Sequence, residues 1–447
     1  MAVTTAPDKH AGNQLEAPLT LTTETPRTLG LFDQTAMWGN FGISLFGPVT
    51  GAYVAAYTGD LLTALLASLV GSVVGALILG ASAVFGSHTG APAMVALRGM
   101  FGRRGSVVPT VLNIAQSVGW ATVEIILIST VAAQVLGGSD WRWAWALIAG
   151  VVATTMAIRP LGSVRLLRKA MVLLVPLASA YLFYEVLSHP VHEIPGSGSY
   201  GFWPAVDVAM AGIVSFSPLA ADYSRHSRTN RAAFGGAAIG YGAAALVYLV
   251  LGALAVATLA TDADTMIATL VALPVGALTL AILAVDEVDE AFANIYSTTM
   301  STHNVLPQVD RRVISAAIGV IATALALFIN MDGYTDFLYL VGSVFIPLFA
   351  VATADFFVVC RMRWDVSDRA SFRWAPVAAW LVGFVSYQLL NPGTLRGWSD
   401  FWYDVQGWSH FTPPVWMGAS IGSILVGGAT ATLFGLIAHV TRHGVTR

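Results

Sequence analysis

The chain contains a series of apolar segments of roughly 20 residues, the length that an α-helix needs to cross a bilayer. Hydrophobic residues make up 56% of the 447 positions, and charged residues make up only 11%. A water-soluble protein could not cover its surface with so few charges. We therefore predict an all-α polytopic membrane protein with twelve transmembrane helices, over residues 32–58, 60–85, 107–135, 142–158, 164–188, 204–221, 233–259, 269–302, 311–330, 335–361, 374–391 and 416–441.

The basic residues predict how these spans are oriented. All of the 22 lysines and arginines except Arg142 and Arg396 fall on one side of the predicted spans. Because basic loops face the cytoplasm, we expect a multi-pass protein of the cytoplasmic (inner) membrane with both termini in the cytoplasm. Residues 1–30 are polar and lack an apolar core, so we expect a disordered cytoplasmic tail.

Helix-breaking residues occur in the middle of two predicted spans. Residues 39–48 of the first span include three glycines and a proline, and residues 215–218 of the sixth span end in a proline. Proline removes a hydrogen bond from the helix, and a membrane interior tolerates the freed carbonyls only where protein or a water-filled cavity satisfies them. Both segments therefore predict broken helices beside a cavity, although each one alone could be a simple kink.

Two other predicted spans carry polar stripes. In the third span, Gln116, Trp120 and Glu124 follow one another at intervals of four residues and so share one helix face. Glu124 needs a polar cavity, a proton or an interhelical hydrogen bond to a serine or threonine. The eighth span contains the acidic residues of segment 286–290, which are too many for a face toward lipid, so a vestibule or protonation is expected there.

The spacing of these features indicates an internal repeat. Phe216 follows Gly42 by 174 positions, and Asn294 follows Trp120 by the same 174 positions. We therefore predict that the five spans of residues 31–190 are repeated by those of 200–362, with two accessory transmembrane helices in 373–441. Because each repeat has an odd number of spans, the second is inverted. An inverted repeat with paired broken helices is typical of secondary transporters with a site at the midplane.

Several dispersed segments, in chain order, resemble the nucleobase:cation symporter family, purine/cytosine permease branch. The resemblance extends over nearly the whole chain from residue 29 and is carried by residues 86–90, 101–105, 116–120, 222–225, 291–298, 345–348 and 355–356. It implies a leucine-transporter-type fold, a five-plus-five inverted repeat with broken helices 1 and 6, and alternating access.

The resemblance also implies where a substrate binds. A planar base would lie between the rings of Trp120 and Phe216, where relatives carry a tryptophan at the second position. The full set of candidate substrate-binding residues is Phe41, Gln116, Trp120, Glu124, Ser215, Phe216 and Asn294. Hydantoin-type relatives carry glutamine at the position of Glu124, which argues against hydantoin as the substrate.

A sodium site is implied in the same way. Its candidate ligands are carbonyls of the first-span break and oxygens of the eighth span, namely Gly39, Gly42, Asn294, Ser297 and Thr298. Neutral oxygens suit a monovalent cation, whereas a divalent ion favours carboxylates. Some relatives use protons instead, and the alternative role for Ser297 and Thr298 is a hydrogen bond within their own helix.

The sequence thus predicts a secondary active transporter, not an enzyme, that imports a nucleobase by sodium symport, with cytosine as the first candidate. The nearer alternative is a proton-coupled permease for a purine, allantoin, a hydantoin or a thiamine-precursor pyrimidine. The alternative from another class is a membrane receptor or enzyme, which the missing catalytic motif and soluble domain disfavour. We expect no cofactor beyond the coupling ion, with the lipid bilayer and a small-molecule base as partners and no nucleic acid.

Overall fold

The computed structural model describes residues 25–136, 138–158, 160–194, 200–259 and 261–444, and its regular elements are helices. The first half contains α1 (Leu31–Phe41), α2 (Phe46–Thr58), α3 (Leu61–Thr89), α4 (Ala93–Ala96), α5 (Arg98–Gly105), α6 (Val107–Val135), η1 (Ser139–Trp141), α7 (Arg142–Ile158) and α8 (Pro160–Ser188). The predicted breaks in the first and sixth spans are both present, the first between α1 and α2.

The second half begins with α9 (Phe202–Val214) and α10 (Ser217–Ser224), which form the other broken span. The helices that follow are α11 (Asn230–Gly235), η2 (Gly236–Tyr241), α12 (Gly242–Leu259), α13 (Met266–Ala272), α14 (Gly276–Val305), α15 (Arg311–Phe328), α16 (Tyr334–Thr353) and η3 (Ala354–Val359). The chain ends with α17 (Trp374–Leu390), α18 (Trp398–Ser409) and α19 (Ala419–Gly444).

Within the described residues, seven helical stretches are long and apolar enough to cross a membrane, judged by length and composition. They are Leu61–Thr89, Val107–Val135, Phe202–Ser224, Asn230–Leu259, Arg311–Phe328, Tyr334–Val359 and Ala419–Ala438. Shorter apolar helices cover Arg142–Ile158, Leu173–Ser188 and Trp374–Leu390. Each predicted span overlaps a helix of the structure, and the total of twelve transmembrane helices stays a prediction.

The predicted start of the eighth span is wrong. We expected a continuous helix from residue 269, but α13 ends at Ala272 and α14 begins at Gly276. Leu273 has an extended backbone, with φ −61° and ψ 155°. The proline that follows it disfavours helical geometry in the preceding residue, which explains the interruption.

The segment 25–30 is ordered, so the predicted disordered tail does not hold for these residues; residues 1–24 lie outside the described part. The Leu29 amide donates to the His226 carbonyl at 3.0 Å, and the Arg228 amide donates to the Leu29 carbonyl at 2.8 Å. The Thr25 hydroxyl donates to the Gly90 carbonyl at 3.0 Å. These bonds attach the start of α1 to the α10–α11 connection and to the end of α3.

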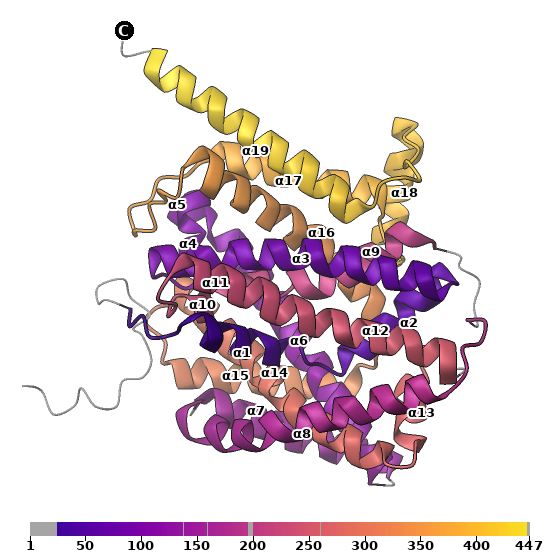
Figure 1. Ribbon diagram of the computed structural model, residues 1–447. Helices are drawn as coiled ribbons and strands as arrows, with labels where there is room; N and C mark the ends of the chain where they lie inside the picture. The colour runs from indigo at the N-terminus through magenta and orange to yellow at the C-terminus, as the bar shows by residue number, and fades with distance from the viewer. Residues whose placement is uncertain (1–24, 137, 159, 195–199, 260, 445–447) are drawn as a thin grey trace, which may run out of the picture.

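Figure 1 shows α17, α18 and α19 along one side of the molecule and α7, α8 and α15 toward the opposite side. Between them, α6 packs along α14, α2 packs along α12, and α3 packs along α9 and α10. The contact between α2 and α12 is unusually close. A Cβ atom added to Gly51 would lie 2.0 Å from the Leu249 carbonyl oxygen, and one added to Gly252 would lie 2.0 Å from that of Pro48. This contact fixes α2, and with it the first break, against α12.

Candidate functional site

Both broken spans lose their helical hydrogen bonds over short segments, of which the second is buried and the first is partly buried. The first break covers residues 42–45, between α1 and α2, and the second covers residues 215–216, between α9 and α10. Backbone groups at such breaks need partners from other parts of the protein. The two breaks obtain these partners in different ways.

At the first break, a glutamate side chain accepts hydrogen bonds from the interrupted segment. Glu287 of α14 accepts a hydrogen bond from the Ser44 hydroxyl at 2.7 Å and another from the Leu45 amide at 2.9 Å. The Ser44 hydroxyl also accepts from the Phe46 amide at 3.1 Å. The amino-terminal end of α2 therefore meets a carboxyl group, whose ionised form the helix dipole favours.

At the second break, an amide side chain donates a hydrogen bond to a carbonyl of the interrupted segment. Gln116 of α6 donates to the Ser215 carbonyl at 3.1 Å and to the side-chain oxygen of Asn113 at 3.0 Å. The Ser215 hydroxyl donates back to the Gly212 carbonyl at 2.6 Å. Gln116 and Ser215, two of the candidate substrate-binding residues, therefore lie together and hold the break through neutral groups.

A cavity lies where the two breaks meet α6, α12, α14 and α16. The space in it that the centre of a water-sized sphere can reach is about 50 Å³, which is enough to hold water, since one molecule needs about 10–15 Å³ by this measure. Its lining residues are Gly42, Ser44, Phe46, Gly47, Thr50, Trp120, Ala209, Gly212, Ile213, Phe216, Tyr241, Ala245, Leu249, Glu290 and Tyr334. Trp120 and Phe216, the predicted stacking pair, thus line one cavity.

Aromatic side chains form much of the cavity wall. Phe46 stacks on Tyr334 with ring centroids 5.2 Å apart and meets Trp120 edge-on at 5.8 Å. Phe216 contacts Tyr241 at 4.7 Å. The Trp120 indole nitrogen is buried and has no hydrogen-bond partner among the described residues. An aromatic wall with an unused donor fits a flat, polar-edged molecule.

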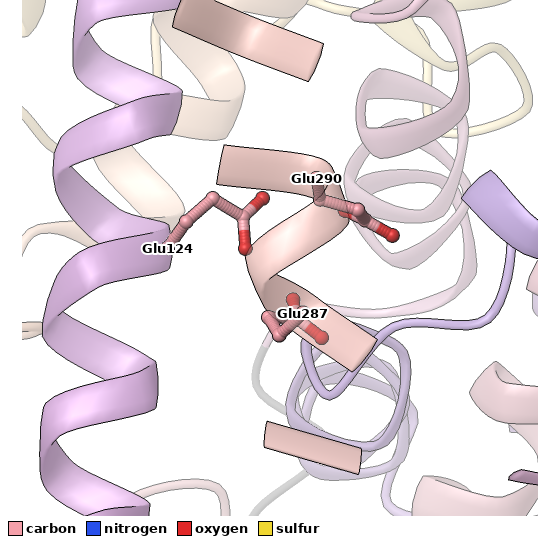
Figure 2. A group of neighbouring side chains, drawn as sticks. All are labelled: Glu124, Glu287 and Glu290. Carbon is pink, nitrogen blue, oxygen red and sulfur yellow. The ribbon is translucent and has the colours of Figure 1, made fainter. Parts of the chain in front are cut away.

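Three glutamates meet beside this cavity. Glu124 extends from α6 toward Glu287 and Glu290 of α14 (Figure 2), and one carboxylate oxygen from each lies within 4.8 Å of the others. Their exposed fractions are 1%, 1% and 3%, respectively. No lysine or arginine occurs in α1, α2, α6, α9, α10, α12, α14 or α16. This group, hereafter the glutamate triad, is therefore compensated by protons, a cation or a cationic ligand.

Comparison with protein-family models decides the class of the protein. Residues 22–390 match the model described as permease for cytosine/purines, uracil, thiamine, allantoin. The chain belongs to this permease family. Comparison with curated proteins gave no match.

Solved structures share the fold of this permease. An inward-facing conformation of Mhp1 gives a TM-score of 0.71 at 16% identity, covering 96% of this chain and 95% of Mhp1. A second structure is that of Mhp1, described as a nucleobase-cation-symport-1 family transporter, in a closed conformation with bromovinylhydantoin bound. It gives a TM-score of 0.68 at 16% identity and covers 94% of this chain and 95% of Mhp1. MhsT in complex with L-phenylalanine gives a TM-score of 0.55 at 13% identity, covering 94% of this chain and 99% of MhsT. The predicted leucine-transporter-type fold is confirmed.

The other predicted substrate-binding residues of the permease lie behind the cavity wall. Phe41 contacts the Phe216 ring at a centroid distance of 6.3 Å. Glu124 belongs to the glutamate triad, and the Asn294 amide donates to the Glu290 carbonyl one turn earlier in α14 at 3.2 Å. They surround the lining residues without being among them, so their contact with a substrate stays a prediction.

The predicted cation ligands have hydrogen-bond partners within the protein. The Ser297 hydroxyl donates to Asp222 of α10 at 2.7 Å, and the Thr298 hydroxyl donates to the Asn294 carbonyl at 2.7 Å. The Gly42 amide donates to the Gly39 carbonyl at 3.2 Å. Thr298 thus makes the hydrogen bond within its own helix that was the alternative to cation binding. A carbonyl oxygen has a second lone pair, so these bonds leave the sodium site a prediction.

Sequence reasoning missed several cavity residues of the permease. Ser44 lies in the predicted break, and Glu290 lies in the acidic segment whose role was left open. Their polar character in a membrane span was a signal that could have assigned them to the site. Phe46, Tyr241 and Tyr334 gave no such signal, because aromatic residues are common throughout membrane helices.

Proposed function

We propose that the permease imports a nucleobase across the cytoplasmic membrane by cation symport with alternating access, with both termini in the cytoplasm. The observation that supports this proposal most is the cavity between the two broken helices, which has Trp120 and Phe216 on its walls. Aromatic rings stack on the flat face of any base, at about 1–3 kcal/mol per ring in nucleic-acid sites. The family to which the chain belongs transports such rings.

Cytosine is our first candidate among the bases. Glu290 reaches the cavity wall, and one of its oxygens has no partner among the described residues. Cytosine presents an exocyclic amine beside the ring acceptor N3, and a protonated carboxyl group, which accepts through one oxygen and donates through its O–H, matches this pair. Uracil lacks this amine and presents a carbonyl oxygen in its place.

Sodium is our first candidate for the coupling ion, at Gly39, Gly42, Asn294, Ser297 and Thr298. A monovalent cation moving inward gains about 2.3 kcal/mol per 100 mV of membrane potential, which can concentrate a neutral base. The glutamate triad favours a second candidate, the proton, because three buried carboxylates need neutralisation. A purine, allantoin, a hydantoin and a thiamine-precursor pyrimidine are the competing substrates.

Uptake by purified protein in liposomes tests the substrate and the ion together. Labelled cytosine should accumulate under an inward sodium gradient, and unlabelled cytosine should compete better than uracil, adenine, guanine, allantoin, hydantoin or an aminopyrimidine. Accumulation driven only by a pH gradient would select the proton. No uptake of any of these rings under either gradient would contradict the proposal.

A variant pair tests the sodium site. Thr298→Ala should reduce the sodium stimulation of uptake, because it removes one proposed ligand without touching the bond between Ser297 and Asp222. Thr302 is the matched control, since its hydroxyl donates to the carbonyl of Thr298 at 2.8 Å in the next turn. Sodium dependence that is equally strong in wild type, Thr298→Ala and Thr302→Ala would reject the site.

A further inference from the structure

The glutamate triad joins three functional parts of the molecule. Glu124 comes from α6, and Glu290 lines the cavity. Glu287 binds the first break through Ser44 and Leu45. A change of charge in the triad therefore acts on the cavity, on α6 and on the broken helix at the same time.

The triad cannot hold three negative charges. Its carboxylate oxygens lie within 4.8 Å of one another in a region with almost no solvent exposure. The other titratable groups that face it are Tyr241 of η2, Tyr248 of α12, Tyr334 of α16, and Asp286 and Asp289 of α14. None of these groups carries positive charge at neutral pH. Carboxylates at such distances do not all ionise together.

The three glutamates differ in their hydrogen-bond partners. Glu287 accepts from the Ser44 hydroxyl and the Leu45 amide, which stabilise its ionised form. Both oxygens of Glu124 and one oxygen of Glu290 are buried and have no donor among the described residues. Figure 2 shows Glu124 aimed into the triad from across the helix interface. A protonated carboxyl could donate to a neighbouring carboxylate, which would satisfy these oxygens.

We infer that the glutamate triad is a proton-binding unit, in which Glu287 carries the negative charge while Glu124 and Glu290 hold protons. Its role in transport rests on the proposed function, with the protons entering from water on one side of the membrane and leaving to water on the other. A base that covers Glu290 excludes water and raises the cost of a second charge there, so the base binds the protonated unit. Base and proton then bind cooperatively.

A bound metal ion fits the triad less well. A monovalent ion would leave a net charge of about −2 in a buried site, and calcium takes about six to eight oxygen ligands. The nearby wall is formed largely by the rings of Phe46, Trp120, Phe216, Tyr241 and Tyr334. A proton neutralises one carboxylate without requiring a shell of further oxygens.

Infrared spectroscopy of the purified full-length protein, without any base, tests the protonation directly. Wild type should show a carboxylic-acid C=O band at neutral pH, shifted by isotope exchange in heavy water. If two protons occupy the triad, Glu124→Gln and Glu290→Gln should each lower this band by about half. Asp264→Asn is the control, because this exposed carboxylate accepts from Tyr53 away from the triad and should leave the band unchanged.

Three results would overturn the proton-binding unit. The first is a wild-type spectrum without the band at neutral pH. The second is a band that neither glutamine variant reduces. The third is a band that disappears on addition of sodium or calcium chloride but not of choline chloride. The first and third use wild type alone, so they hold even if a variant fails to fold.

Equilibrium binding of cytosine between pH 5.5 and 8.5 tests the link to the substrate. In wild type the dissociation constant should rise with pH, by at most about tenfold per pH unit for one linked proton. In Glu124→Gln the rise should be smaller. Failure of wild type to bind cytosine contradicts the proposed substrate while leaving the infrared result intact, and equal pH dependence in both proteins contradicts the link.

Discussion

The two broken helices of this permease meet the same cavity but are held by opposite kinds of partner. At the first break, a buried carboxylate of α14 binds Ser44 and the Leu45 amide, and α2 packs tightly against α12. At the second break, the neutral amide of Gln116 binds the Ser215 carbonyl. Gly212, just before this break, has open space where a Cβ atom would lie.

The difference suggests a division of roles between the breaks. A charge-assisted hydrogen bond is stronger than a neutral one and responds to protonation of its acceptor. The first break is therefore the part that can sense the charge state of the glutamate triad. The second break has open space at Gly212, and under the proposed function it is the part that would adapt to a base.

The largest expected effect separates the aromatic residues of the two breaks. Phe216→Ala and Trp120→Ala should each weaken the binding of every accepted base, by roughly 5- to 150-fold if a stacking ring contributes about 1–3 kcal/mol. Phe46→Ala at the first break should weaken it less, because this ring is already stacked on Tyr334. Equilibrium binding to protein of confirmed folding measures all three variants.

Trp120→Phe keeps a ring and should be milder than Trp120→Ala. Unchanged affinity in Trp120→Ala would contradict the proposed site, and a larger loss in Phe46→Ala than in Phe216→Ala would reverse the comparison of the two breaks.

The next effect compares the hydrogen bonds that hold the breaks. Ser44→Ala removes a donor to the Glu287 carboxylate and should lower the free energy of unfolding by about 1.5–3 kcal/mol, whereas Gln116→Ala removes neutral bonds and should lower it by about 0.5–1.5 kcal/mol. Thermal or denaturant unfolding in one detergent gives the difference. An equal or larger loss in Gln116→Ala would show that the charge at the first break adds no stability.

A third comparison concerns the space around two glycines. A Cβ atom at Gly47 would lie 2.4 Å from the Cβ atom of Tyr248, whereas one at Gly212 meets nothing within 4 Å. Gly47→Ala should therefore destabilise the fold by roughly 1–3 kcal/mol through overpacking, and Gly212→Ala should not. Melting temperatures measured side by side check this pair. Similar melting temperatures would mean that the first break is no more tightly packed than the second.

Much of this architecture could be predicted from the sequence, because membrane spans restrict where polar residues and prolines can occur. The bounds of α6 match the predicted 107–135, and both breaks lie where glycine and proline placed them. Trp120 and Phe216, which the resemblance assigned to one site, line one cavity, and the stacking of a base between them stays a prediction. These features depend on local sequence or on a recognisable pattern.

The contacts between remote helices could not be predicted. Nothing near Glu287 in sequence indicates that it binds Ser44, which lies 243 positions earlier. Likewise, the pairing of Ser297 with Asp222 depends on how α10 meets α14. The start of α14 was missed because apolar residues continue through Leu273, although Pro274 interrupts the helix there.

The ordered segment before α1 has a mechanical consequence. Leu29 exchanges two main-chain hydrogen bonds with the residues that follow α10, through the His226 carbonyl and the Arg228 amide. The half-helices α1 and α10, which come from the two different broken helices, are thereby coupled. If α10 moves relative to α1 during a transport cycle, the segment at Leu29 must move with both helices, or both hydrogen bonds must break. A truncation that removes Leu29 would uncouple α1 from α10, whereas a tag placed before Thr25 would leave both hydrogen bonds of Leu29 in place.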